Sequence, residues 1–154
     1  MHLDIMHNAQ GIMDYINASI GGDGLKLDEN GVASLAIEDD IVCLFCVLEA
    51  ERELVTTLYL GRADKSNADL LYEMMCGNYM GAYTGGGTIG IDAEEGLVAL
   101  HQHFPLPVEE PAWIEEPLSA LIGAARYWRD KIRAAAAPIG TGAPEMAASA
   151  FIRV

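Results

Sequence analysis

An apolar run of eight residues, Ile41 to Leu48, limits what this chain can fold into more than any other stretch. It reads IVCLFCVL and has acidic residues next to both ends. The run is far shorter than the roughly 20 residues of a membrane-spanning helix, and its length and β-branched residues indicate a strand. Because successive side chains of a strand point to opposite faces, both faces of this strand are apolar. Each face therefore needs a cover, either from the core of the same domain or from a partner chain.

The rest of the sequence predicts a single α+β domain with an antiparallel sheet, three helices and the protomer order α-β-β-β-α-β-β-α. Hydrophobic periodicity and turn residues predict a helix over 3–20, strands over 32–38, 41–49 and 54–60, a helix over 67–82, a hairpin over 88–104 and a helix ending near Ala135. Pro117 either kinks the last helix or marks its start. The domain is expected to span residues 1–134, and residues 135–154, rich in Ala, Gly and Pro, are expected to be a disordered tail.

The charge balance excludes several classes of partner. The chain has 154 residues, a formal net charge of −14 and 51% hydrophobic residues. Nucleic acids and anionic membrane surfaces attract clustered Lys and Arg, so a chain this acidic is expected to bind neither and to favour basic partners. The opening residues MHLDIMHNAQ lack the basic residues and the long apolar stretch of a secretory signal. We therefore expect a cytoplasmic protein without membrane insertion.

A glycine-rich stretch, TGGGTIG over residues 84–90, has the spacing G-x-G-x-x-G of a dinucleotide-binding turn. That motif works between a strand and a helix, because the N-terminus of the helix must face the pyrophosphate. Here a predicted helix precedes the glycines and a predicted hairpin follows them, which is the reverse order. The stretch is therefore interpreted as a loop that leaves a helix and enters a hairpin.

The cysteines and histidines predict no catalytic or metal site. Cys43 and Cys46 have the spacing C-x-x-C, but within one strand their Cα atoms lie about 10 Å apart on opposite faces, too far for a disulfide. His101 and His103 share a strand face and could begin a metal site, but further ligands are not evident, and a polar exposed face is the preferred interpretation. No Ser, Thr or Cys lies beside a base in a nucleophile motif. We expect no cofactor, no metal and no catalytic residue.

The second predicted helix is apolar over more than one face. A surface helix normally buries one apolar stripe and exposes the other side to water. The sheet can cover one face, so we expect a second copy of the chain to cover the other, with a helix sandwiched inside one protomer as the alternative. The candidate homodimer interface consists of Leu71, Met74, Met75, Cys76, Tyr79 and Met80.

Three stretches, in the predicted order of elements, resemble the class I type III secretion chaperones of the Tir chaperone (CesT) family. They are GLKLDENGVASLAIEDD over residues 24–40, NYMGAYTGGGTIGIDAEEGLVALHQHFPL over 78–106 and LIGAARYWRDKI over 121–132. The family has a similar turn and strand in the first, a helix end, glycine-rich loop and hairpin in the second, and a closing helix with a Trp in the third. The resemblance covers about residues 3–133, and Pro117 departs from the usual pattern.

The resemblance implies a homodimeric chaperone and not an enzyme. Such a chaperone binds the N-terminal segment of a secreted effector in a largely extended form, and keeps it soluble and competent for export. Contact with the secretion apparatus is a further expectation. The alternative is a small acidic ligand-binding or nucleotide-binding protein, or an enzyme, that uses the glycine-rich loop and the H-Q-H pair.

The effector groove is expected on the first helix and on the second face of the apolar strand. The candidate effector-binding residues are Leu3, Met6, Met13, Val42, Leu44, Cys46 and Leu48. Met6 and Met13 have an alternative role as ordinary core residues. An extended segment could add a strand to a sheet edge and place alternate side chains against apolar surface.

Overall fold

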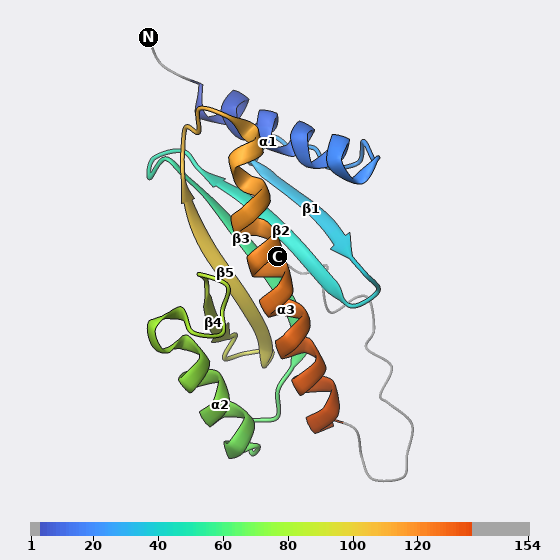
Figure 1. Ribbon diagram of the computed structural model, residues 1–154, viewed down its shortest axis with the longest axis vertical. Coiled ribbons are helices and arrows are strands. Elements are labelled where there is room, and N and C mark those ends of the chain that lie inside the picture. The colour runs from blue at the N-terminus through green and yellow to red at the C-terminus, as the bar shows by residue number, and fades with distance from the viewer. Residues whose placement is uncertain (1–3, 137–154) are drawn as a thin grey trace.

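A five-stranded antiparallel sheet with helices on one face forms the part of the chain that the computed structural model describes, residues 4–136 (Figure 1). In chain order the elements are α1 (Ile5–Ile20), β1 (Val32–Ile37), β2 (Ile41–Leu48), β3 (Glu53–Arg62), α2 (Ala68–Asn78), η1 (Tyr79–Gly81), β4 (Thr88–Ile91), β5 (Leu97–Pro105), η2 (Pro111–Ile114) and α3 (Glu115–Ala136). The strands lie in the order β1-β2-β3-β5-β4, so β3 pairs with β5 although α2 and β4 separate them in the chain. The predicted α+β class and element order are confirmed.

The first helix has a clear sequence signal at each end. Asp4 is the N-cap, and its Oδ1 accepts hydrogen bonds from the backbone N–H groups of Met6 and His7 at 3.0 and 3.2 Å. Gly21 ends the helix with φ of 69°, a left-handed conformation that costs glycine little. The residues that α1 buries are Ala9, Ile12, Met13 and Ile16.

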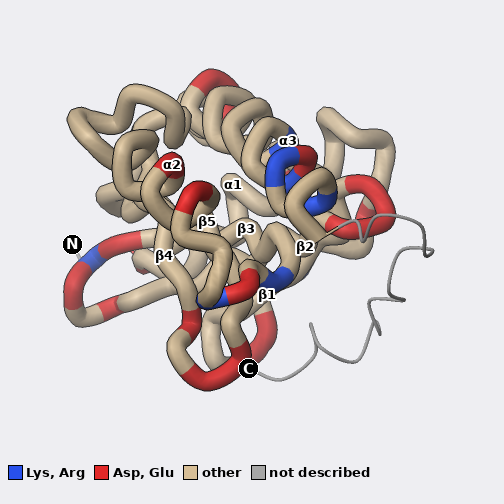
Figure 2. The backbone as a smooth tube through the Cα atoms, turned by 90° about the horizontal axis from the view of Figure 1, so that it is seen from below, with Lys and Arg blue, Asp and Glu red and all other residues tan. Residues whose placement is uncertain are grey.

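Alternating burial along the strands places the core between the sheet and the helices. On β2, Ile41, Cys43 and Phe45 are fully buried, whereas the residues between them are only half-buried. α1 and α3 cover the buried face, and α3 contributes Leu121 and Trp128 to the core. Within residues 4–136 no helix lies against the opposite face (Figures 1 and 2).

Two boundaries differ from the prediction for physical reasons. α2 ends at Asn78, before the predicted residue 82, because Tyr79 leaves the α-helical path with ψ of 115° and Met80 follows with a positive φ of 57°. Pro117 lies in the first turn of α3, where backbone N–H groups have no intrahelical acceptor, so the N–H that proline lacks is not needed there. Pro117 therefore marks the start of the helix and does not kink it. α3 continues to Ala136, and the rest of the predicted tail lies outside the described residues.

Basic residues gather on α3, whereas many acidic residues lie in the turns (Figure 2). Four cations of α3, Arg126, Arg129, Lys131 and Arg133, form ion pairs with carboxylates of the same protomer. In the described part of the chain no helix combines the length and the apolar character needed to cross a membrane.

Candidate functional site

The uncovered face of the sheet is apolar where β1, β2 and β3 meet. Four side chains of β2 lie there half-buried, namely Val42, Leu44, Cys46 and Leu48. The strand register places Val32 of β1 on one side of Cys46 and Val55 of β3 on the other. These side chains alternate with core residues on the same strands, so the pleat holds them away from the core. The face therefore keeps an apolar stripe available to a partner.

The same face becomes polar toward β5. The rings of His101 and His103 lie there with centroids 6.0 Å apart, and Glu53 Oε2 is 2.7 Å from His103 Nδ1. Burial, together with the neighbouring His103, lowers the pKa of His101, which keeps its imidazole neutral at pH 7. The two histidines share a face as predicted. Among residues 4–136 no three His, Cys, Asp or Glu side chains are grouped so that they could hold a metal ion.

The predicted groove residues of α1 lie in different environments. Met6 is half-buried and packs near Gly31, at the start of β1. Met13 is completely buried among the core residues, so its expected place on a groove surface is corrected to the alternative role in the core. Helical spacing could not separate the two, because both lie next to the isoleucine stripe of the same helix. Leu3 lies outside the described residues.

The outward side of α2 and η1 exposes large apolar side chains to solvent. Tyr72 is 71% exposed, Met75 75%, Tyr79 75% and Met80 87%. Cys76 is also exposed, and Leu71 is half-buried. A contiguous set of exposed apolar side chains is uncommon on a monomer and marks an interaction surface. We call these six residues, with Tyr83, the α2 patch.

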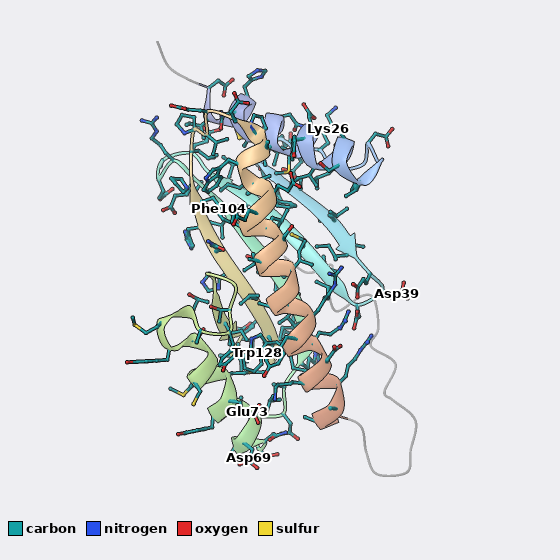
Figure 3. All side chains as sticks on the ribbon, in the orientation of Figure 1. Lys26, Asp39, Asp69, Glu73, Phe104 and Trp128 are labelled. Carbon is teal, nitrogen blue, oxygen red and sulfur yellow. The ribbon has the colours of Figure 1, made fainter. Side chains whose placement is uncertain are left out.

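The inner side of α2 belongs to the protomer core. Met74 is only 2% exposed, so its expected place in the dimer interface is corrected to a core position. Trp128 of α3 lies against this side of α2 (Figure 3), and its Nε1 donates a hydrogen bond to the Tyr83 carbonyl at 2.8 Å. The prediction that α2 has two apolar faces is thus confirmed, with one face in the core and the other in solvent.

Sequence reasoning missed part of the α2 patch and its surroundings. Tyr83 is 61% exposed and its ring stacks on that of Tyr127, with centroids 6.2 Å apart. Tyr127 of α3 is 46% exposed, whereas Leu121 and Ala125 of the same helix are completely buried. A helical projection of α3 would have identified Tyr127 as an exposed aromatic residue. Tyr83 follows η1 in a loop, where periodicity gives no signal.

The glycine-rich loop packs closely against α3 and β5. A Cβ atom on Gly85 would lie 2.3 Å from the Ala120 carbonyl oxygen, and one on Gly87 would lie 2.7 Å from both His101 O and Leu121 Cδ1. Gly85 also has φ of 60°. The loop follows α2 and η1 and precedes β4, which confirms the predicted order of elements. Close packing thus accounts for these glycines, and their geometry gives no support to a nucleotide-binding loop.

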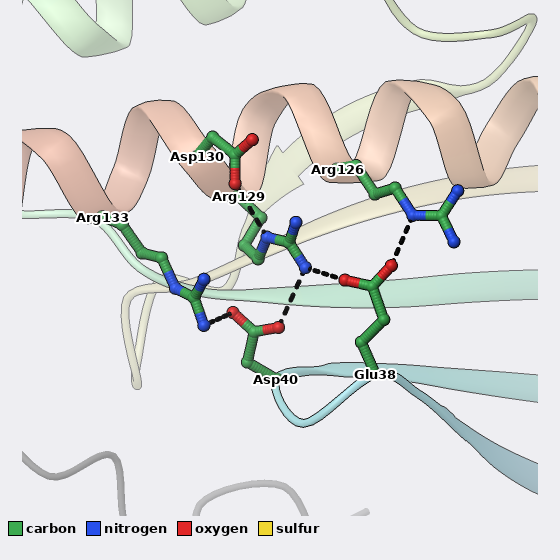
Figure 4. Close-up of polar contacts among 6 residues, drawn as sticks. All are labelled: Glu38, Asp40, Arg126, Arg129, Asp130 and Arg133. Atoms are coloured by element: carbon green, nitrogen blue, oxygen red, sulfur yellow. Dashed lines mark hydrogen bonds and ion pairs between the residues drawn. The ribbon is translucent and has the colours of Figure 1, made fainter.

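A cluster of charged residues fastens α3 to the turn between β1 and β2 (Figure 4). Arg129 is 8% exposed; its Nη1 donates to Asp40 Oδ1 at 3.0 Å and also binds Glu38 Oε2. Arg126 Nε donates to Glu38 Oε1 at 2.6 Å, and Arg133 pairs with Asp40 Oδ2. The bonds from Arg129 and then Arg126 hold the pKa of Glu38 below its ordinary value.

The sequence model of the Tir chaperone protein (CesT) family matches residues 13–129. The chain belongs to this family. The matched residues include β2, the whole α2 patch, the glycine-rich loop and most of α3, whereas Met6 precedes them. No curated protein sequence matches the chain.

Solved structures of low sequence identity share the fold of this Tir chaperone family member. A chain of the ExsC–ExsE complex is 19% identical, with a TM-score of 0.73 over 84% of this chain and 97% of that one. A chain of the HopA1–SchA chaperone–effector complex is 17% identical, with a TM-score of 0.67 over 81% and 95% of the two chains. The complex of the Yersinia pestis type III secretion chaperone SycH with a YscM2 fragment gives 16% identity and a TM-score of 0.61 over 78% and 98%.

Proposed function

We propose that this protein works as a homodimeric type III secretion chaperone in the bacterial cytoplasm. It binds the N-terminal segment of a cognate effector in a largely extended form, and keeps that effector soluble and competent for export. The function is binding and release, without a catalysed reaction. Family membership supports the chaperone role, and the chaperone–effector complexes that share the fold support an effector as the partner.

The apolar stripe on the uncovered sheet face is the observation that carries this proposal. The stripe on β2 lies half-buried with no helix against it in residues 4–136, although the same strand is fully buried on its other face. An unfolded effector segment carries apolar side chains that would otherwise aggregate in water. Placing them on this stripe buries apolar area of both molecules, while ordering the segment takes back part of the gain. The complex can therefore be specific and still reversible.

The proposed effector-binding residues are Met6, Val42, Leu44, Cys46 and Leu48, with Leu3 beyond the described residues. Met6 lies close to Gly31 and to the helix side of the sheet, whereas the other four residues lie on the uncovered face, so Met6 would contact a part of the segment that passes the start of β1. The α2 patch serves as the proposed dimer interface, because its exposed side chains gain most from burial against a second copy. The two surfaces use different elements, so a dimer would leave both effector surfaces accessible.

Affinity for an effector segment tests the proposal. The protein is co-expressed with the first ~100 residues of the product of a neighbouring gene, since the proposed partner is an extended N-terminal segment. Leu44→Asp places a carboxylate in the apolar stripe and should weaken binding at least about tenfold, the effect of losing one anchor residue. Ser119→Asp adds the same charge at an exposed position of α3 and should leave affinity unchanged.

If wild type and Leu44→Asp bind the effector segment with equal affinity, the apolar stripe is not the effector-binding surface. Circular dichroism of the free variants must show the same fold as the wild type, so that a weaker affinity cannot be caused by unfolding.

A further inference from the structure

The apolar surface on the uncovered face of the sheet does not end at β2. The strand register pairs Val42 of β2 with Tyr59 of β3, and Tyr59 with Ala99 of β5. All three side chains are half-buried on this face. Because neighbouring strands lie about 4.8 Å apart, this apolar path crosses about 10 Å of the sheet. A partner that buries the whole path therefore covers β5 as well as β2.

His101 lies directly beside this path. It follows Ala99 on the same face of β5, and the strand register places it between Thr57 of β3 and Thr88 of β4. The side chain of His101 is half-buried, whereas that of His103 is exposed. The two rings lie edge to face with centroids 6.0 Å apart. Of the two histidines, His101 is thus the one that a segment crossing from β2 would cover.

The two histidines differ in their access to a carboxylate. Glu53 Oε2 lies 2.7 Å from His103 Nδ1, so a protonated His103 has an ion-pair partner on its own face of the sheet. None of the ion pairs within residues 4–136 involves His101. A positive charge on His101 therefore depends on water for its stabilisation.

The strands next to His101 place few titratable groups on this face. On β5 the group is His103, and on β3 the groups are Tyr59, diagonally opposite His101, and Glu53, which is already bound to His103. The residues that β4 places here do not titrate, and they are Thr88 and Gly90. In the described part of the chain, the neighbouring strands thus offer His101 no free carboxylate.

At pH 7 the imidazole of His101 is neutral. Burial, and after it the neighbouring His103, lower the pKa of His101 below the ordinary value of 6.5. A segment that covers the ring removes more water from it and opposes protonation further, because a buried charge without a partner is costly. A charge on His101 must in turn weaken the binding of that segment, since linked equilibria affect each other equally.

We propose that the effector segment extends from the apolar stripe across β3 onto His101, that it binds while this imidazole is neutral, and that protonation of the imidazole releases it. The inference rests on the proposed function, because the segment is the one assigned to the stripe. It adds His101, Tyr59 and Ala99 to the surface that the segment covers. His103 contributes less to the response, since Glu53 is its partner when it is charged.

The pH dependence of the affinity tests this inference. Wild type should bind the co-expressed effector segment at least about threefold more weakly at about pH 5.5 than at about pH 7.5, because binding excludes a proton. His101→Gln replaces the imidazole with an uncharged side chain and should remove most of this difference. His7→Gln is the matched control, since His7 is exposed on α1 and belongs to neither proposed surface, and it should retain the wild-type difference.

Nuclear magnetic resonance of the wild-type imidazoles gives a second readout that needs no variant. His101 should titrate at a lower pH in the complex than in the free protein, because the segment removes water from its ring. Circular dichroism at both pH values shows whether each variant keeps the wild-type fold.

Three results would overturn the inference. The first is equal wild-type affinity at both pH values. The second is a His101→Gln variant whose affinity falls with pH as much as that of the wild type. The third is a His101 titration that the segment does not move to lower pH. All three presuppose a complex at pH 7.5 and so leave the proposed function standing, whereas the absence of that complex would refute both.

Discussion

Gly77 lies on the side of α2 that faces α3, at the point where Trp128 comes closest. A Cβ atom on Gly77 would be 2.4 Å from Trp128 Cζ2, well inside van der Waals contact. The indole cannot easily move aside, because it is 2% exposed and its Nε1 is hydrogen-bonded to Tyr83 O. The absence of a side chain at this position therefore sets the distance between the two helices.

Gly77→Ala is expected to lower the free energy of unfolding by about 1–3 kcal/mol, the usual cost of overpacking a core. Gly123→Ala is the matched control, since Gly123 is exposed in α3 and a Cβ there would meet no heavy atom within 4 Å. That change should raise the free energy of unfolding by roughly 0.5–1 kcal/mol, because alanine favours a helix more than glycine does. Chemical denaturation measures both. A neutral Gly77→Ala variant would mean that Trp128 has room to move.

Met13 and Met74 show where sequence reasoning fails for single residues. The sequence pattern predicts both on surfaces because each lies in an apolar helix, but both are buried in the protomer core. Spacing along a helix says which residues share a face, but not which of two apolar faces meets the sheet. Met75, one position after Met74, is 75% exposed. The direction in which α2 packs decides between them, and that direction depends on β4 and on Trp128 of α3.

At the scale of elements, α3 is joined to the β1–β2 turn by charge as well as by packing. Glu38 is central to this junction, since it binds Arg126 and Arg129, and its φ of 62° fixes a tight turn. Its folded-state pKa lies below the ordinary value of 4.5 because both arginines favour the carboxylate. A lowered pKa contributes stability that is present above the unfolded-state pKa and is lost as the pH falls through the folded-state pKa.

Glu38→Gln should therefore destabilise the protein at pH 7 and have progressively less effect as the pH falls below about 4.5, the ordinary glutamate pKa. The measurement is the difference in unfolding free energy between wild type and variant across pH 7 to 3. Glu29→Gln removes an exposed carboxylate that has no ion pair in residues 4–136, and as the control it should change the free energy of unfolding at pH 7 by no more than about 0.5 kcal/mol. A difference for Glu38→Gln that stays constant with pH would exclude a charge-based junction.

The elements themselves could be predicted largely from local patterns. The run IVCLFCVL became β2 at residues 41–48, and its alternating burial follows from the pleat. Sequence patterns could not predict that β5 inserts between β3 and β4, because pairing depends on contacts between distant residues. They also could not show that Asn78 closes the edge of β4, since its bonds to Ile89 exist only once α2 has docked. The apolar stripe was predicted because it needs only the alternation of one strand.

For the whole molecule, the α2 patch predicts a dimer with twofold symmetry. In such a dimer the same residues meet from both copies, so a single substitution acts twice. Met75→Glu would bring two carboxylates into an apolar interface, which is costly without partners. The variant should be monomeric at micromolar concentration, where the wild type is dimeric, as measured by light scattering or sedimentation.

Ile20→Glu is the control for this experiment, since Ile20 is exposed at the far end of α1 and lies outside the α2 patch. It should remain dimeric. A folded, dimeric Met75→Glu variant would assign the interface to another surface.

The pairing of β3 with β5 also has a kinetic consequence. Glu53 pairs with Pro105 and Arg62 with Leu97, so pairing β3 with β5 closes a loop of roughly 35 to 50 residues. The chain loses the conformational entropy of this loop before most of the stabilising contacts between the strands have formed. Chains dominated by such distant pairings fold in milliseconds to seconds, not microseconds. Until β5 pairs with β3, β3 is an outer strand of the partial sheet formed by β1, β2 and β3, and its free edge is uncovered. A newly made chain therefore exposes the edge of β3 until β5 pairs with it, and an uncovered edge strand is a template for pairing with another chain.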